Sequence, residues 1–455
     1  MLTYFVLYVP YLVLLDLWSL SNFVVFAKMW HNIETKNQKI RTAFETKMSK
    51  VKLKFPEHFL WGAASSAYQT EGNNINADWW AWEHSEKRKN YVKNRRSNPQ
   101  QYISGEATDF FNRYDEDFSI AQHLNHNTIR FGLEWSRIEP QEGRFDEVAL
   151  AKYEKMLQSA KAHGLQVFLT LHHFTLPLWF AKKEGFSKKD NIRYFLQYTE
   201  KVVRRLGDYV DFWLTFNEPE VYATHSYLLG IFPPQRKSFF KALRVVNNII
   251  LAHNITAPQI KSQTGKPVSM AFHLSDLQPS GLLGGVVRSL SHYIANEYIL
   301  RRTLNTCDFI GVNYYEHFHI GIMGRRTSSR TGHEFTDLNW SIHPEGLERV
   351  LLNLKKYNKP IYITENGLAD EKDLKREKFI KDHLYFVHRA IKQGADVRGY
   401  LYWSLTDNFE WQHGFWPRFG LVEIDRENSL KRKVRFSALK YAEICKDNLL
   451  EYEIK

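Results

Sequence analysis

Short apolar runs alternate with longer amphipathic stretches along most of this chain. The short runs are rich in β-branched and aromatic residues and predict buried strands, whereas the longer stretches repeat their apolar positions with a helical period. Two of these stretches, which begin at Val148 and Glu345, end near Gly or Asn, as helices do. Eight apolar runs can be counted, beginning at Phe59, Thr128, Leu165, Val210, Pro267, Cys307, Pro360 and Val397. Eight β-then-α units predict an α/β fold made of a single (β/α)8 TIM barrel with a parallel sheet.

Polar and aromatic side chains stand at the ends of these apolar runs. They are Glu134 and Trp135, His172 and His173, Asn217 and Glu218, Asn313 to Tyr315, Glu365 and Asn366, and Glu410 and Trp411. The carboxyl ends of barrel strands open onto the face that carries the active site in such folds. The pattern therefore predicts one active site at the C-terminal ends of the strands.

Two glutamates follow the fourth and seventh runs, Glu218 in TFNEP and Glu365 in ITENG. A carboxylate after a buried strand needs a partner or a chemical task. Glycoside hydrolysis uses two carboxyl groups: one protonates the leaving oxygen, and the other attacks the anomeric carbon when the two lie ~5–5.5 Å apart. We expect a charged Glu365 to raise the pKa of Glu218, and Arg130, in TIRFGLEW, to keep Glu365 ionised.

Eight motifs follow one another between about Lys54 and Leu450. They are FLWGAASSAYQTEG, IRFGLEWSRIEP, LTLHHFTLP, TFNEP, GVNYYEHF, WSIHPEGL, YITENGL and YWSLTDNFEWQHGFWPRFGLV. In this order they resemble glycoside hydrolase family 1, the β-glucosidase/β-galactosidase group. The resemblance implies a β-glucosidase-like O-glycosyl hydrolase that acts by double displacement and retains the anomeric configuration.

The resemblance also implies roles for individual residues. Glu218 is implied to be the acid/base, Glu365 the nucleophile and Asn217 the ligand of the sugar 2-OH. Arg130 and Tyr315 would hold Glu365 charged and oriented. The implied substrate-binding residues, which contact sugar hydroxyls, the sugar ring or the aglycone, are Gln69, His173, Asn217, Trp340, Trp403, Glu410, Trp411 and Phe419.

One match to the family and one departure from it bear on the substrate. The chain keeps Glu410 beside Trp411, where relatives that act on 6-phosphorylated sugars carry a phosphate-binding set, so a non-phosphorylated glycone is expected. The segments GIFPPQRKSFFKALR and HLSDLQPSGLLGGVVRSL are shorter than the corresponding family segments, which implies a more open aglycone site. Glucose, galactose and fucose stay open as the glycone. A transglycosidase and a non-catalytic sugar-binding barrel are the alternatives to a hydrolase.

Residues 1–27 are strongly apolar and long enough to span a bilayer. Asp16 and Pro10 disfavour a spanning helix, and no basic region precedes the stretch as in a signal peptide. We expect residues 1–49 to be an N-terminal extension, either a membrane anchor or a misassigned start, and residues 50–455 to form the barrel. Because Lys and Arg residues follow the apolar stretch, the catalytic domain is expected in the cytoplasm, free or anchored.

Charge and residue composition narrow the classes of ligand that this protein is expected to bind. The net charge of +12 is spread among acidic residues, which favours a solvated surface over a nucleic-acid site. The two cysteines, Cys307 and Cys445, form neither a disulfide framework nor a zinc spacing, and His172 and His173 are adjacent rather than one helical turn apart. No metal and no organic cofactor are expected. The expected partner is a small β-glycoside or short oligosaccharide, and the oligomeric state stays open.

Overall fold

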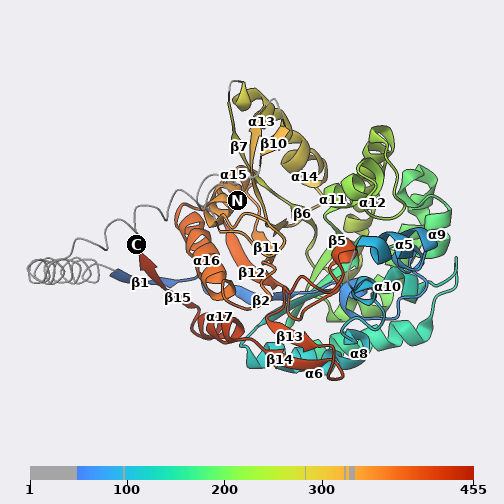
Figure 1. Ribbon diagram of the computed structural model, residues 1–455, viewed down its shortest axis with the longest axis horizontal. Helices are drawn as coiled ribbons and strands as arrows, with labels where there is room; N and C mark the ends of the chain where they lie inside the picture. The colour runs from blue at the N-terminus through green and yellow to red at the C-terminus, as the bar shows by residue number, and fades with distance from the viewer. Residues whose placement is uncertain (1–48, 96–97, 282, 322–323, 327–333, 455) are drawn as a thin grey trace, which may run out of the picture. The chain divides into compact units, whose positions relative to one another are not determined.

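Eight parallel strands close into a barrel in the computed structural model of this protein (Figure 1). They follow one another around the barrel in chain order: β2 (Leu60–Ala64), β3 (Thr128–Gly132), β4 (Gln166–His172), β5 (Phe212–Asn217), β6 (Val268–His273), β8 (Ile310–Asn313), β11 (Ile361–Asn366) and β12 (Val397–Trp403). Each strand lies inside one of the eight predicted apolar runs. The prediction of a (β/α)8 barrel is therefore confirmed.

The structure describes residues 49–95, 98–281, 283–321, 324–326 and 334–454. The chain divides into two compact units, Met1–Lys52 with Glu451–Lys455, and Leu53–Leu450. Strands β1 (Ser49–Lys54) and β15 (Leu449–Ile454) pair in a two-stranded sheet. The apolar segment 1–27 and nearly all of the predicted extension lie outside the described residues. No helix in the described part of the chain is long and apolar enough to cross a bilayer.

Helices surround the barrel (Figure 1). The longer ones are α6 (Phe110–His123), α8 (Glu147–Ala162), α10 (Ile192–Leu206), α12 (Phe239–Thr264), α15 (Pro344–Leu354), α16 (Arg376–Lys392) and α17 (Phe436–Asp447). Shorter helices are α3 (Ala67–Thr70), α4 (Asp78–Glu83), α5 (Glu86–Arg95), α7 (Trp135–Ile138), α9 (Leu178–Lys182), α11 (Pro219–Ala223), α13 (Gly284–His292) and α14 (Tyr298–Thr303). The helix predicted from Val148 begins one residue earlier, because the Asp146 side chain accepts hydrogen bonds from the first free backbone N–H groups of α8.

Packed aromatic rings close the amino-terminal end of the barrel. Phe168 and Phe212, from β4 and β5, stack with ring centroids 4.2 Å apart. Tyr362 of β11 lies 5.3 Å from Phe168 and 5.2 Å from Phe309, which precedes β8. Such layers of side chains make the barrel interior a core rather than a pore. The polar strand ends can therefore gather only at the opposite, carboxyl-terminal end.

Two of the predicted apolar runs continue beyond the barrel into a small separate sheet. Strand β6 ends at His273, and the residues that follow it form β7 (Asp276–Pro279) instead of extending β6. Strand β7 pairs in parallel with β9 (His317–Gly321), and β9 pairs with β10 (Gly324–Arg326). The break between β6 and β7 is stabilised by Asn296, whose side chain bonds both the N–H and the C=O of Ser275. Strands β13 (Val422–Asp425) and β14 (Lys431–Val434) form a further antiparallel pair.

The ends of β11 and β12 approach each other closely at Gly367, which follows β11. A Cβ atom at this position would overlap the carbonyl oxygen of Trp403. We expect Gly367→Ala to lower the free energy of unfolding by about 1–3 kcal/mol, because the added methyl group must push the two strand ends apart. Gly285→Ala is the control, because no atom lies within 4 Å of its Cβ position. Urea unfolding measures both variants, and equal stabilities would contradict this close packing.

Candidate active site

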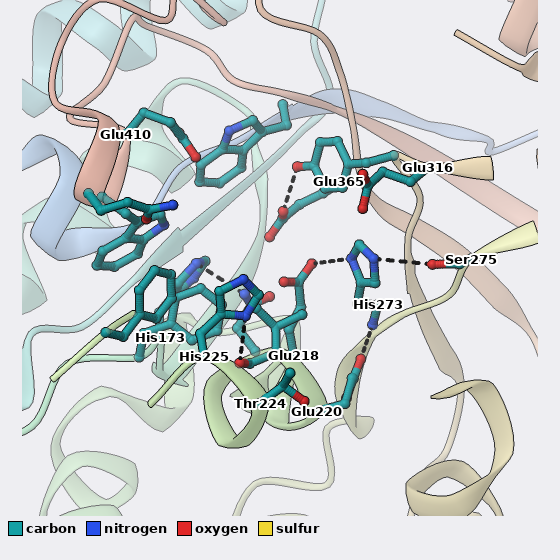
Figure 2. A pocket seen from close by; sticks show the side chains of 18 of the residues that line it. His173, Glu218, Glu220, Thr224, His225, His273, Ser275, Glu316, Glu365 and Glu410 are labelled. Atoms are coloured by element: carbon teal, nitrogen blue, oxygen red, sulfur yellow. Dashed lines mark hydrogen bonds and ion pairs between the residues drawn. The ribbon is translucent and has the colours of Figure 1, made fainter. Parts of the chain in front are cut away.

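A pocket of about 500 Å³ lies at the carboxyl ends of the barrel strands (Figure 2). Every site residue expected from the sequence lines it except Arg130: Gln69, His173, Asn217, Glu218, Tyr315, Trp340, Glu365, Trp403, Glu410, Trp411 and Phe419. Arg130 is fully buried in β3 and supports two of the lining residues from beneath. The barrel thus brings together residues that lie more than 300 positions apart in the sequence.

Glu365, the penultimate residue of β11, is held by two donors. Arg130 Nη1 donates to Glu365 Oε1 at 2.6 Å, and the Tyr315 hydroxyl donates to Oε2 at 2.7 Å. Arg130 Nη2 also donates to the Asn217 side-chain oxygen at 2.6 Å. Because both carboxylate oxygens are engaged, the orientation of Glu365 is fixed before any ligand binds.

Glu218 stands where β5 turns into α11. Its backbone lies in the left-handed region, with φ 42°, and its N–H donates to the carbonyl oxygen of Ala271 in β6 at 2.8 Å. This conformation is uncommon for a residue other than glycine and marks sites where function imposes strain. It directs the carboxyl group into the pocket (Figure 2). Asn313 Nδ2 donates to Glu218 Oε1 at 2.8 Å.

His273, the last residue of β6, is a site residue that the sequence reasoning missed. Its Nδ1 lies 3.4 Å from Glu218 Oε1, and its Nε2 lies 3.4 Å from the Ser275 hydroxyl. Its ring stacks on that of Tyr315, and its backbone N–H donates to Glu220 (Figure 2). The signal was weak, because Leu274 and Leu277 extend the predicted apolar run beyond His273.

His273 changes the electrostatics expected for the two glutamates. Burial raises the pKa of Glu218, but the positive charge of His273 and hydrogen bonds from His273 and Asn313 outweigh it, so this pKa lies below its ordinary value. Burial and the charge of Glu218 raise the pKa of Glu365 to about 7, although Arg130 and Tyr315 oppose the rise. These directions are the reverse of those expected from the glutamate pair without His273.

The charge on His273 itself comes from the surrounding carboxylates. Burial lowers the pKa of its imidazole, but Glu218, Glu316 and Glu220 together raise it to about 9. At neutral pH His273 is therefore a partly buried cation in contact with Glu218. Arg130 compensates the charge of Glu365, and His273 compensates that of Glu218.

One corner of the pocket offers polar groups beside aromatic rings. Gln69 Nε2 and Asn408 Nδ2 both donate to Glu410 Oε2, at 3.2 and 2.9 Å. Burial raises the pKa of Glu410 to about 7. His173 Nε2 lies 3.0 Å from Asn217 Nδ2. The pocket wall nearby is aromatic, with Trp403 and Trp411 each 6.0 Å from the ring of His173.

Such a combination of polar groups and flat apolar faces suits a carbohydrate, whose ring has hydroxyl edges and C–H faces. On another wall, Trp340 lies 5.7 Å from Tyr315 and 6.1 Å from Phe419, measured between ring centroids. The pocket therefore has a polar corner with two tryptophans and a separate aromatic wall.

Comparison with known proteins identifies the family. The family model described as glycosyl hydrolase family 1 matches residues 51–282 and 294–449. The chain belongs to this family. The resemblance found in the sequence motifs is thereby confirmed.

Individual members of glycosyl hydrolase family 1 are similar over nearly their whole length. Beta-glucosidase A of Acetivibrio thermocellus is 30% identical, over 87% of this chain and 99% of that protein. The solved structure of a beta-glycosidase from Pyrococcus horikoshii is 35% identical, with a TM-score of 0.79, over 89% of this chain and 97% of that one. A beta-glucosidase from Thermotoga maritima in complex with glucoimidazole has a TM-score of 0.80 at 28% identity, over 87% and 99%. This protein is a β-glucosidase-like O-glycosyl hydrolase, and its ligands are β-glycosides.

One cluster in the described part of the chain has metal-ligand geometry, but it lies outside the pocket. The ligand atoms of Asp276, His317 and His343 all lie within 4.8 Å of one another. Arg349 donates to both carboxylate oxygens of Asp276 and lies 2.6 Å from His343 Nε2. A guanidinium group thus already supplies the positive charge that a metal ion would bring.

The position of His273 generates a pH prediction. A cation beside a carboxyl group stabilises its anion, so His273→Asn should raise the pKa of Glu218 and shift the pH profile of kcat/KM upward by about 1 unit. The profile should be measured with an alkyl β-glucoside, because its alcohol leaving group needs a proton in order to depart. A dinitrophenyl β-glucoside, whose leaving group needs none, serves as the control and should shift much less. An unchanged profile, or a shift to lower pH, would show that His273 is not charged beside Glu218.

Proposed function

We propose that this protein hydrolyses non-phosphorylated β-glucosides or β-galactosides with retention of anomeric configuration. Glu365 acts as the nucleophile and Glu218 as the acid/base. The observation that carries the proposal is that the two carboxyl groups have different hydrogen-bond and ion-pair partners. Glu365 is fixed at both oxygens by Arg130 and Tyr315, as an attacking group must be, whereas Glu218 contacts a titratable partner, His273.

In the first step, a carboxylate oxygen of Glu365 attacks the anomeric carbon while Glu218 gives its proton to the glycosidic oxygen. The bond between the anomeric carbon and that oxygen breaks, and a glycosyl ester of Glu365 forms. In the second step, Glu218 takes a proton from water, which attacks the anomeric carbon and releases Glu365. Asn217, held by Arg130, donates to the sugar 2-OH in both steps.

His273 gives Glu218 a second proton-binding group at its side. The pair holds one proton at neutral pH, which resides mainly on the imidazole, and a bound glycoside that excludes water favours its transfer to Glu218. His273 is in this sense a positioning residue, because it acts on substrate through Glu218.

The polar corner of the pocket is the proposed glycone site. Glu410, Gln69 and His173 bind the hydroxyl groups, while Trp403 lies under the ring and the Trp411 indole N–H donates to it. A phosphorylated sugar would bring a second negative charge toward Glu410, which disfavours it. Trp340 and Phe419 form the aglycone side. Relatives named beta-glucosidase and beta-galactosidase both occur among the similar proteins, so both glycones belong to the proposal.

Transfer of the glycosyl group to an acceptor other than water is the second proposed function. A protein of Arabidopsis thaliana named galactolipid galactosyltransferase SFR2 is 31% identical over 74% of this chain and 58% of that protein. A transferase would use the same glycosyl ester and differ only in the group that attacks it. Product analysis in the presence of an alcohol acceptor separates the two reactions.

We also propose that residues 1–49 form an extension distinct from a barrel domain at residues 50–455, and that the barrel acts in the cytoplasm. The Lys and Arg residues that follow the apolar segment 1–27 support this orientation.

The roles of the two glutamates are tested by their amide variants. Glu365→Gln should lower kcat by about four orders of magnitude or more for every β-glycoside, because no ester can form. Glu218→Gln should lower the rate of alkyl β-glucosides by about 10²–10⁴-fold, but should affect glycosylation by a dinitrophenyl β-glucoside far less. Glu443→Gln, a change of an exposed carboxyl group on α17, controls for loss of one charge.

The stereochemistry is tested separately with the unmodified protein. Proton NMR of the first sugar released should show the β-anomer before mutarotation. Release of the α-anomer would rule out the ester of Glu365.

A further inference from the structure

Exposed apolar side chains are concentrated in two short segments of this protein. In the described part of the chain, ten of the eighteen exposed large apolar residues lie within residues 228–243 and 283–294. Single exposed apolar residues are common on soluble proteins, but clusters of them mark interaction sites. The two segments are therefore candidates for an interaction site.

Helix α13 presents an apolar face outward. Val287 and Ala295, on its inner side and just beyond its end, pack on the small sheet formed by β7, β9 and β10. Val286, Leu290 and Ile294, spaced four residues apart on the other side, are each 61–71% exposed. A surface helix of a soluble domain normally turns its polar side to water. Here apolar side chains occupy both sides.

The second segment lies between α11 and the first turn of α12. Leu228 and Leu229 are exposed at the end of the short π-helical turn Thr224–Leu228, and Phe239 and Phe240 are exposed at the start of α12, with Phe240 77% exposed. Figure 1 shows that α12 and α13 both project on the side of the molecule where β6 ends.

Both segments reach the active-site pocket. Leu229 from one segment and Ile294 from the other line the same pocket as Glu218 and Glu365. The apolar surface is therefore continuous with the place where a glycosidic bond is broken. We call the exposed apolar residues of segments 228–243 and 283–294 the apolar rim.

The two rim segments carry basic residues and no acidic ones, although Glu184 from outside them lies 3.9 Å from Lys241. Residues 221–275 and 277–296 contain no Asp and no Glu. The rim segments and the first turns of α12 carry five cations: Arg236, Lys237, Lys241, Arg244 and Arg288. Exposed apolar side chains among Lys and Arg are the combination that binds anionic lipid surfaces. An acidic or neutral polar partner would not require the apolar part.

One part of the rim, helix α13, lies outside the family match. The family match covers residues 51–282 and resumes at 294, so that residues 283–293, which contain α13, fall outside it. The barrel and its pocket are shared with the family, whereas the outward apolar face of α13 is not part of the shared pattern.

We propose that the apolar rim docks on a membrane surface and that the substrates include β-glycosides whose aglycone is a lipid chain. The sugar occupies the pocket, and the lipid chain leaves it between Leu229 and Ile294 toward the bilayer. The Lys and Arg residues of the rim contact anionic headgroups. The substrate class rests on the proposed hydrolytic function, whereas membrane docking does not.

The test compares vesicle-bound and water-soluble substrates with the full chain. Vesicles of phosphatidylcholine and phosphatidylglycerol carry an octadecyl β-glucoside, and nitrophenyl β-glucoside is the soluble substrate. One variant combines Val286→Ser with Leu290→Ser, and another combines Phe239→Ser with Phe240→Ser; none of these residues lines the pocket. We expect each variant to lose about tenfold or more of the activity on vesicles, with nitrophenyl glucoside activity within about twofold of the original protein. Vesicle sedimentation should fall in parallel.

Phe436→Ser with Leu439→Ser on α17 is the matched control, because both residues are exposed and neither lines the pocket. This control should retain vesicle binding and activity. Raising the ionic strength should weaken sedimentation of the original protein, since salt screens the attraction to anionic headgroups.

Several outcomes would overturn the proposal. If the rim variants bind and cleave on vesicles like the original protein, the rim does not dock, and any membrane binding comes from elsewhere, such as residues 1–27. If the variants convert a dimer to a monomer without changing vesicle activity, the rim is an interface between copies of this chain. If no β-glycoside is cleaved at all, the hydrolytic proposal fails, and sedimentation of the rim variants still decides whether the surface docks.

Discussion

The ion pair between Arg130 and Glu365 is the interaction on which the site depends. Arg130 is fully buried in the barrel, and a buried charge without a partner is costly; breaking such a pair by removing one member typically costs about 3–5 kcal/mol. Its guanidinium reaches Glu365 in β11 and Asn217 in β5, so that one side chain of β3 ties three strands together. The residues proposed to carry out the reaction therefore also contribute to the stability of the barrel.

A second cation, the partly buried His273, gives the other glutamate a different environment. Five glutamates line the pocket, Glu218, Glu220, Glu316, Glu365 and Glu410, and two of them, Glu218 and Glu365, are buried. Removal from water raises the pKa of Glu220, Glu365 and Glu410, whereas the charge and hydrogen bonds of His273 and Asn313 lower that of Glu218. Arg130 cannot lose its proton, whereas an imidazole can. Glu365 therefore has a permanently charged partner, whereas the partner of Glu218 can itself gain or lose a proton.

The pocket changes character from its floor to its mouth. Near the strand ends it is lined by amides, carboxylates and indoles, which match a sugar. At its edge, Leu229 and Ile294 lead to an apolar and basic surface that a sugar does not need. A molecule with a polar head and an apolar tail fits this gradient better than a free oligosaccharide, whose hydroxyl groups would lose water at the rim without finding partners.

The sequence by itself determined the number of barrel strands, the end of the barrel at which the site lies, and the family. These depend on local signals: the period of apolar positions, the polar residue that ends each run, and short motifs in order. It did not determine where β6 stops, because apolar residues still alternate with polar ones as far as Leu277 and only pairing with β9 separates β7 from the barrel. Nor did it find the contact between His273 and Glu218, or the resulting pKa directions, since these arise from groups 55 positions apart. The sequence also did not determine which face of α13 is exposed. An amphipathic pattern defines two sides of a helix, but the tertiary packing decides which side contacts water.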